Sequence, residues 1–326
     1  MYFDAHSDIW TDVTIRRLQG ERNVLRSHHL ARLRKGGVEG SILVIWVDHP
    51  AEIGYAARTG QIKAAVQAEI EELTEEDGVR IVHTCSEIQQ ARAEGKMYII
   101  IGIEGMAAIG TDVSKVDDYY AFGCRHGMLT WNEANALGAG ASSGVSTGLT
   151  DAGKQVVRRM QELGMLVDVS HLNDAGFWDI ARMTTRPFIA SHSNCRALCD
   201  VPRNLTDDQL RAIRDAEGVV GLNAYNEFVD KQYDHQTVEG LARHAAHMID
   251  VMGIDHVGCG FDFFEFLDDV GGEPPTGPEK FALKGLKDAS DIPNLFACFE
   301  KMGMSREEME KLAFRNFHEV YRKAVG

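Results

Sequence analysis

The chain has 326 residues, of which 44% are hydrophobic and 25% are charged, as in an ordinary soluble globular protein. The formal net charge of −15 argues against nucleic acid and anionic membranes as partners, because both bind positively charged surfaces. No apolar run approaches the ~20 residues that span a bilayer, and no secretion signal is evident. The six cysteines are scattered and form no Cys-x-x-Cys pair, which predicts reduced thiols in a cytoplasmic protein.

Apolar strands alternate with amphipathic helices along the whole chain. Strands are predicted at residues 2–8, 40–47, 97–103, 127–131, 165–169, 186–191, 218–223 and 256–261. Several of them are β-branched runs without polar alternation, which is typical of strands covered on both faces. Helices are predicted at residues 60–74, 115–123, 150–163, 173–183, 206–216 and 237–252, with Thr150 and Thr206 as N-caps.

Eight strands that alternate with helices predict an α/β fold, a (β/α)8 barrel of the TIM type forming one domain over residues 1–326. Residues 284–326 would add extra C-terminal helices packed on the barrel. A doubly wound open sheet is the alternative, but no Gly-rich dinucleotide fingerprint follows the first strand. Residues 265–280 are predicted to form a long loop, and residues 13–35 an excursion beside the first strand.

Metal-capable side chains occur at the ends of five predicted strands. His6 and Asp8 are two positions apart on the first strand, so both point to the same face. The third, fifth, sixth and eighth strands are followed by Glu104, His171, His192 and Asp262. Each residue alone is more often structural or solvated than a ligand. Because the C-terminal ends of barrel strands meet at one rim, five such ends together predict a metal site.

Three imidazoles and two or three carboxylates at one rim can hold two zinc-like ions. A bridging carboxylate would keep the ions ~3.5–4 Å apart, the spacing of two-metal hydrolases. Imidazole with carboxylate suits Zn²⁺, while Mn²⁺, Co²⁺ and Fe²⁺ stay open. A water shared by two such cations loses its proton near neutral pH and becomes a nucleophile.

The other histidines are expected outside this site. Among them, His28 and His29 form a solvated pair, His244 and His247 lie on a helix and face solvent or the neighbouring helix, and His126 and His256 precede strands.

The ordered motifs resemble those of the membrane (renal) dipeptidase family of zinc dipeptidases. The matching segments are Asp4-Ala5-His6-Ser7-Asp8, Ile101-Gly102-Ile103-Glu104-Gly105, Asp168-Val169-Ser170-His171, Ala190-Ser191-His192-Ser193, Arg203-Asn204-Leu205-Thr206-Asp207-Asp208 and Arg315-Asn316-Phe317. The resemblance extends over nearly the whole chain. It implies a (β/α)8 barrel, a small dipeptide as substrate and, by analogy with the family, a homodimer.

The resemblance also implies the metal ligands. His6 and Asp8 would bind one zinc and His171 and His192 the other, with Glu104 bridging both. A hydroxide between the two ions would attack the peptide bond of a dipeptide, including dipeptides with a D-residue at the C-terminus.

Three further roles follow from the same resemblance. Arg203 matches the family arginine that holds the free carboxylate of the substrate, a task that a bidentate guanidinium performs well. Asp262 matches the aspartate that orients the water or carries its proton. Tyr225 falls near the wall of the pocket.

Two departures from the family affect the substrate more than the metal site. Trp131 stands where the animal enzymes have a histidine thought to stabilise the tetrahedral intermediate, and an indole cannot transfer a proton. Asn132 is the polar group that could replace it. Phe264 stands where the animal proteins have a second aspartate.

Three functions are therefore open. The first is a binuclear zinc dipeptidase. The alternative is a metal-dependent amidohydrolase acting on another carboxylate-bearing amide or lactam, which Trp131 keeps open. The third is a catalytically silent barrel that serves as a binding or scaffold protein, against which all five ligand positions are filled.

Overall fold

The computed structural model describes residues 1–47, 53–266 and 282–326. Its main sheet is parallel and has the strand order β1 (Tyr2–Ser7), β2 (Val38–Trp46), β4 (Met97–Glu104), β5 (Cys124–Met128), β6 (Leu166–Asp168) and β7 (Phe188–Ile189). The short β3 (Val79–Ile81) pairs with the beginning of β4, and β5 pairs with its end. A second parallel pair consists of β8 (Val220–Leu222) and β9 (Val257–Cys259).

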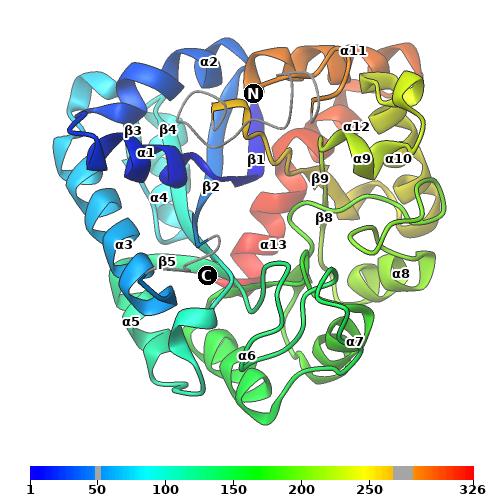
Figure 1. Cartoon of the computed structure of the whole chain (residues 1–326). Coiled ribbons are helices and arrows are strands. Elements are labelled where there is room, and N and C mark those ends of the chain that lie inside the picture. Colours follow the sequence, from blue (N-terminus) through cyan, green and yellow to red (C-terminus); the bar gives the residue numbers. More distant parts are fainter. Residues whose placement is uncertain (48–52, 267–281) are drawn as a thin grey trace.

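Single backbone bridges connect the second pair to both edges of the main sheet. Ala190, directly after β7, bridges to Val220 of β8, and Ser7 of β1 bridges to Phe263 beyond β9. The strands therefore form a curled parallel sheet, and the predicted mixed α/β class is confirmed. Figure 1 shows the strands near the middle of the molecule, with α3, α5, α6, α7, α8 and α10 around them.

The helices have these bounds: α1 (Ile9–Leu18), α2 (Leu30–Lys35), α3 (Tyr55–Glu72), α4 (Cys85–Ala93), α5 (Lys115–Phe122), α6 (Asp151–Leu163), α7 (Asp174–Met183), α8 (Asp207–Asp215), α9 (Asn226–Val229), α10 (Val238–Met252), α11 (Ile292–Lys301), α12 (Arg306–Glu310) and α13 (Asn316–Ala324). Both predicted N-caps are confirmed, because the Thr150 and Thr206 side chains accept hydrogen bonds from backbone N–H groups of the first turn.

The apolar strand residues divide between two cores according to the alternation of side chains along a strand. Ile99 and Ile101 of β4 face outward into the large core beneath the helices. Tyr98 and Ile100 face inward and pack with residues of other strands and of α13. Both faces of β4 are therefore buried, which explains why its sequence shows no polar alternation.

Helix α13 covers the beginning of the strands from inside the curled sheet. The Phe317 ring lies 5.6 Å from the Phe3 ring of β1, and His318 shares a hydrogen bond with the Tyr98 hydroxyl of β4. Val320 and Tyr321 belong to the same inner core. This arrangement leaves the C-terminal ends of the strands as the open rim.

Three sequence predictions need correction. The fourth strand is Cys124–Met128 rather than residues 127–131, so Trp131 follows the strand instead of ending it. Residues 13–35 include most of α1, a π-helical turn and α2 rather than an irregular excursion. The strand β3 and the helix α4 were not predicted. Of the predicted loop 265–280, residues 267–280 lie outside the described residues.

Candidate active site

Three histidines from different strand ends converge on Glu104, the last residue of β4. Its Oε2 lies 3.4 Å from Nε2 of His6 in β1. Its Oε1 lies 2.7 Å from Nε2 of His171 and 3.8 Å from Nε2 of His192. Each oxygen of this carboxylate thus lies nearest to a different histidine, an arrangement that a bridging ligand can use.

Two carboxylates lie on the His6 side of this cluster. Asp8 Oδ2 and Asp262 Oδ1 are each 3.7 Å from His6 Nε2. The donor atoms of His6, Asp8 and Asp262 lie within 4.8 Å of one another, as do those of His6, Glu104 and His192. Asp262, predicted as a proton carrier, is therefore placed as close to His6 as the predicted ligand Asp8.

Neighbouring polar groups orient His171 and His192. His192 Nδ1 lies 2.8 Å from Ser191 Oγ, and His171 Nδ1 lies 3.2 Å from Asn132 Oδ1. An amide oxygen only accepts, so His171 carries its proton on Nδ1. The Nε2 atoms of the two rings lie 2.9 Å apart, which brings their lone pairs toward one centre.

These residues fit divalent cations. His6 is fully buried, and within the described residues its two ring nitrogens and Asp8 Oδ1 have no hydrogen-bond partner. Buried polar groups without partners are costly unless a ligand satisfies them. Neutral imidazoles combined with carboxylates are the donors that Zn²⁺ and similar ions prefer.

Burial and neighbouring charges shift the pKa values within the cluster. Burial raises the pKa of Glu104 to about 8 and the pKa of Asp262 to about 6. For His171 and His192, burial lowers the pKa well below its usual value, which keeps both rings neutral. A cation beside the carboxylates would oppose their shift, because opposite charge favours the ionised form.

A cavity of about 390 Å³ opens over the cluster. It is lined by Asp8, Trp46, Glu104, Trp131, Asn132, His171, Arg203, Tyr225, Glu227, Phe228, Asp262 and Phe264. The predicted substrate-binding residues Arg203, Trp131, Asn132 and Tyr225 are all among them. The predicted site is therefore brought together in one place, with the metal-capable side chains at the base of the cavity.

Arg203 is the buried cation of this cavity, with 5% of its surface exposed. Its guanidinium donates hydrogen bonds to the backbone carbonyls of Ser170 and His192, and one nitrogen lies 3.2 Å from His171 Nε2. The Phe228 ring lies 5.5 Å from its guanidinium carbon. Burial lowers the pKa of Arg203 to about 10, so the group stays charged at neutral pH.

Trp46 and Asn223 are among the site residues that were missed from the sequence, as are Glu227 and Phe228 of the cavity. Trp46 is the last residue of β2, and its position at a strand end was the available signal. Asn223 is fully buried and donates to Asp262 Oδ2 at 3.1 Å and to the His192 carbonyl at 3.3 Å. A single amide after an apolar strand carries no spacing signal that could have identified it.

Two histidine predictions are wrong. His29 is fully buried rather than solvated, because its Nε2 pairs with Asp12 at 2.7 Å. His126 lies within β5 and pairs with Asp168 at 2.7 Å. His244 is buried and faces the neighbouring helix, as predicted, because its Nε2 hydrogen-bonds to the Val229 carbonyl at the end of α9.

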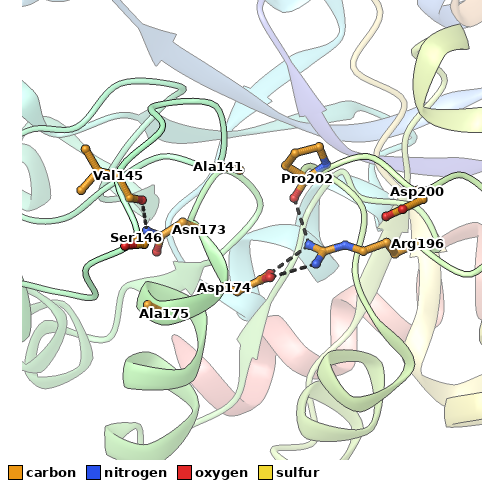
Figure 2. A pocket seen from close by; sticks show the side chains of 9 residues that line it. All are labelled: Ala141, Val145, Ser146, Asn173, Asp174, Ala175, Arg196, Asp200 and Pro202. Carbon is orange, nitrogen blue, oxygen red and sulfur yellow. Dashed lines mark hydrogen bonds and ion pairs between the residues drawn. The ribbon is translucent and has the colours of Figure 1, made fainter.

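A second pocket lies beside the His171 loop but contains none of the predicted site residues. It has a volume of about 320 Å³ and is lined by Ala141, Val145, Ser146, Asn173, Asp174, Ala175, Arg196, Asp200 and Pro202. Figure 2 shows Arg196 donating to both carboxylate oxygens of Asp174 and to the Pro202 carbonyl. The Arg196–Asp174 ion pair therefore joins α7 to the loop before α8.

A family model described as membrane dipeptidase, peptidase family M19, matches residues 1–325. The chain belongs to the membrane dipeptidase family. The resemblance inferred from the motifs is thereby confirmed, and with it the enzyme class, a metal-dependent dipeptidase that hydrolyses peptide bonds. No described helix has the length and apolar character needed to cross a membrane.

This membrane dipeptidase is similar to known protein sequences and to solved structures. A Klebsiella pneumoniae protein, described as uncharacterized and from the pqqA 5' region, is 36% identical over 251 residues, or 74% of this chain and 88% of that protein. An uncharacterized dipeptidase of Schizosaccharomyces pombe is 35% identical over 239 residues, or 71% of this chain and 54% of that protein. A metallo peptidase from Rhodobacter sphaeroides, liganded with a phosphinate mimic of the dipeptide L-Ala-D-Ala, has a TM-score of 0.85 at 26% identity and covers 99% of both chains.

Proposed function

We propose that the chain is a binuclear zinc dipeptidase whose active site lies at the open rim of a closed (β/α)8 barrel. The observation that carries this proposal is the carboxylate of Glu104, whose two oxygens face His6 and His171 at the base of a cavity that also contains Arg203. The backbone bridges at Ala190 and Ser7 support closure of the sheet through β8 and β9.

In this proposal the cluster holds two metal ions. His6 and Asp8 would bind one ion, His171 and His192 the other, and Glu104 both. When bound, two such ions would polarise the scissile carbonyl and activate the attacking water. The protein would contribute fixed ligands, because Asn132 and Ser191 already orient the rings of His171 and His192.

Arg203 and Asp262 would both act on the substrate. Arg203 would form a charge-assisted pair with the free carboxylate of the dipeptide in a cavity that excludes most solvent. Asp262, held at Oδ2 by Asn223, would accept the proton of the attacking water at Oδ1 and deliver it to the leaving amine.

We infer that the substrates include dipeptides with a D-residue at the C-terminus. The Rhodobacter sphaeroides metallo peptidase with its L-Ala-D-Ala mimic supports this inference, since the two chains share their fold over nearly their whole length. An amide or lactam that carries a carboxylate is the alternative substrate. The Trp131 indole favours this alternative substrate, because it stands where the animal enzymes have a histidine.

The proposal is tested by metal content and substrate class together. The protein, dialysed against zinc, should retain close to two ions, and Glu104→Gln should lower that number because the carboxylate serves both. L-Ala-L-Ala and L-Ala-D-Ala should be hydrolysed, whereas N-acetyl-alanine and a carboxylate-bearing lactam should not. Faster turnover of the acetyl or lactam substrates would favour the alternative. Full metal content in Glu104→Gln would contradict the bridge.

The cellular location and the assembly are proposals of the same kind. All six cysteines are free in the structure, which supports a cytoplasmic protein. The homodimer stays a prediction, to be tested by sedimentation of the metal-loaded protein.

A further inference from the structure

We propose that Trp46 and Trp131 form the binding site for the side chain of the substrate's first residue and select dipeptides whose first residue is large and apolar. This inference rests on the proposed dipeptidase function and specifies its substrates. It assigns to Trp131 a role different from that of the histidine at the same position in the animal enzymes.

The two tryptophans span the strand that carries Glu104. Trp46 ends β2 and is paired in register with Glu104 of β4. Trp131 follows β5 on the other side of β4, and a Cβ added at Gly105 would lie 3.2 Å from the Trp131 backbone nitrogen. The two indoles meet edge to face, with 5.1 Å between ring centroids and 64° between planes. They form a continuous aromatic wall over the end of β4.

A separate group of side chains lies around Arg203. Phe228 lies 5.5 Å from the Arg203 guanidinium carbon, and the Tyr225 and Phe228 rings lie 4.6 Å apart. Arg203 follows β7, and Tyr225 and Phe228 follow β8. Trp46, by contrast, ends β2, and Trp131 follows β5. The cavity therefore has two aromatic regions, one beside Glu104 and the other beside Arg203.

The order of groups in a dipeptide assigns one residue to each region. The free carboxylate belongs to the second residue and the scissile carbonyl to the first. With the carboxylate at Arg203 and the carbonyl above Glu104, the first residue extends beyond Glu104 onto the tryptophan wall. The second residue remains beside Tyr225 and Phe228.

The tryptophan wall favours apolar side chains for a physical reason. Indole rings bury apolar surface at roughly 25 cal/mol per Å² and offer a single N–H donor each. A Leu or Phe side chain would therefore be stabilised there, while an Asp side chain would exchange its full hydration for at most one N–H donor from each indole. Discrimination by one methylene is typically about 10–200-fold in kcat/KM, so Leu should exceed Gly at the first position by at least about tenfold.

The test compares two dipeptide series on the zinc-loaded enzyme. One series is Gly-Ala, Leu-Ala, Phe-Ala and Asp-Ala, and the other is Ala-Gly, Ala-Leu and Ala-Phe. Trp46→Ala should reduce the ratio of kcat/KM for Phe-Ala over Gly-Ala by about tenfold or more, while the corresponding ratio in the second series changes little. Tyr225→Ala should show the reverse pattern.

Trp178→Ala is the matched control, because it removes a tryptophan that packs on Phe177 of α7 outside the cavity. It should leave both ratios unchanged. If Trp46→Ala does not fold, Trp131→His provides a second variant, since it replaces the apolar ring by a polar one and should lower the preference for Phe-Ala. Metal content and thermal unfolding confirm that each variant is intact.

Equal losses on Gly-Ala and Phe-Ala, or a changed ratio in the second series only, would overturn the inference while leaving the dipeptidase function intact. A wild-type enzyme that hydrolyses Gly-Ala as fast as Phe-Ala would do the same. A zinc-loaded wild-type enzyme that hydrolyses no member of either series would overturn the proposed function itself.

Discussion

Asp262 has a backbone conformation that few residues other than glycine adopt, with φ of 60°. Its backbone N–H donates to the His6 carbonyl at 3.3 Å, and its Oδ2 accepts from Asn223 at 3.1 Å. Residues in this region persist where the surroundings hold them, and they concentrate at functional sites. The consequence here is that Asp262 Oδ1 is directed toward His6 and the centre of the cluster.

Asp262→Asn tests this carboxylate. Asparagine keeps the shape and the contact with the site but cannot take up a proton, so kcat should fall by roughly 10²–10⁴-fold with metal content unchanged. Steady-state kinetics and elemental analysis of the same preparation measure both quantities. If the variant loses one ion, Asp262 is a ligand, as its grouping with His6 and Asp8 would allow. Near-wild-type turnover would rule out the proton-carrying role.

Arg203→Ala tests recognition of the terminal carboxylate. Loss of a charge-assisted pair in a buried site costs about 2–5 kcal/mol, so kcat/KM should fall strongly on a free-acid dipeptide and much less on its C-terminal amide. Arg203→Lys serves as the comparison variant, because it keeps the charge without the bidentate geometry. An equal loss on the acid and the amide would mean that Arg203 acts only through its bonds to the Ser170 and His192 carbonyls.

The sequence was informative at residue scale where a rule connects position with role. Ligand-type residues at strand ends could be predicted to converge, and Glu104, His171 and His192 do so. His29 could not be predicted, because its partner Asp12 is 17 residues away on another helix. Trp46 was missed because a tryptophan at the end of an apolar strand resembles an ordinary core residue in the sequence.

At the scale of elements, Asp168 connects the ends of three strands beneath the metal-capable histidines. As the last residue of β6 it accepts backbone hydrogen bonds from Ser170 and Ser191 at 2.9 and 3.1 Å, and it pairs with His126 of β5. Burial alone would raise the pKa of Asp168, but hydrogen bonds from His126 and the serines lower it overall. The ionised carboxylate thus holds both histidine-bearing loops in place.

Asp168→Asn should weaken metal binding without removing a ligand. Groups that orient metal ligands typically contribute about 10–100-fold in affinity, and an asparagine cannot accept all the bonds that Asp168 accepts. Competition with a fluorescent zinc chelator gives the affinity directly. Asp174→Asn is the control, since that carboxylate pairs with Arg196 outside the site. Unchanged zinc affinity in Asp168→Asn would contradict a positioning role.

The predicted strands were accurate where buried β-branched residues are continuous, as in β4. The beginning of β5 was missed because Arg125 and His126 resemble loop residues in the sequence. His126 can occupy a buried strand only because Asp168 satisfies it, and that pairing depends on the neighbouring strand. The closing contacts of β8 and β9 likewise depend on single bridges that no local pattern encodes.

For the whole molecule, buried neutral histidines make stability depend on pH. His244 Nδ1 accepts a hydrogen bond from the Cys195 N–H, and Nε2 pairs with the Val229 carbonyl, so the folded state binds the neutral ring. Burial lowers the pKa of His244 to about 4 from 6.5. Between these values the unfolded chain takes up a proton that the folded chain does not. The contribution of His244 to stability should therefore be constant above about pH 6.5 and fall as the pH drops toward about 4.

His244→Gln removes this titration while keeping a side chain that can donate and accept. Its urea midpoint should fall less steeply between about pH 6.5 and about pH 4 than that of the wild type, where His244 contributes up to about 3 kcal/mol. The measurements are made with a chelator present so that metal release does not contribute. Identical pH profiles for both proteins would show that other groups, such as His29 or His318, govern the acid response.

The position of α13 has a consequence for how the chain is made. Phe3 of the first strand is covered by Phe317 of the last helix. A ribosome adding ~5–20 residues per second needs about 15–60 s to progress from one to the other. Throughout that time the inner faces of β1, β2 and β4 lack their final cover. The inner core can therefore be completed only after α13 has been synthesised.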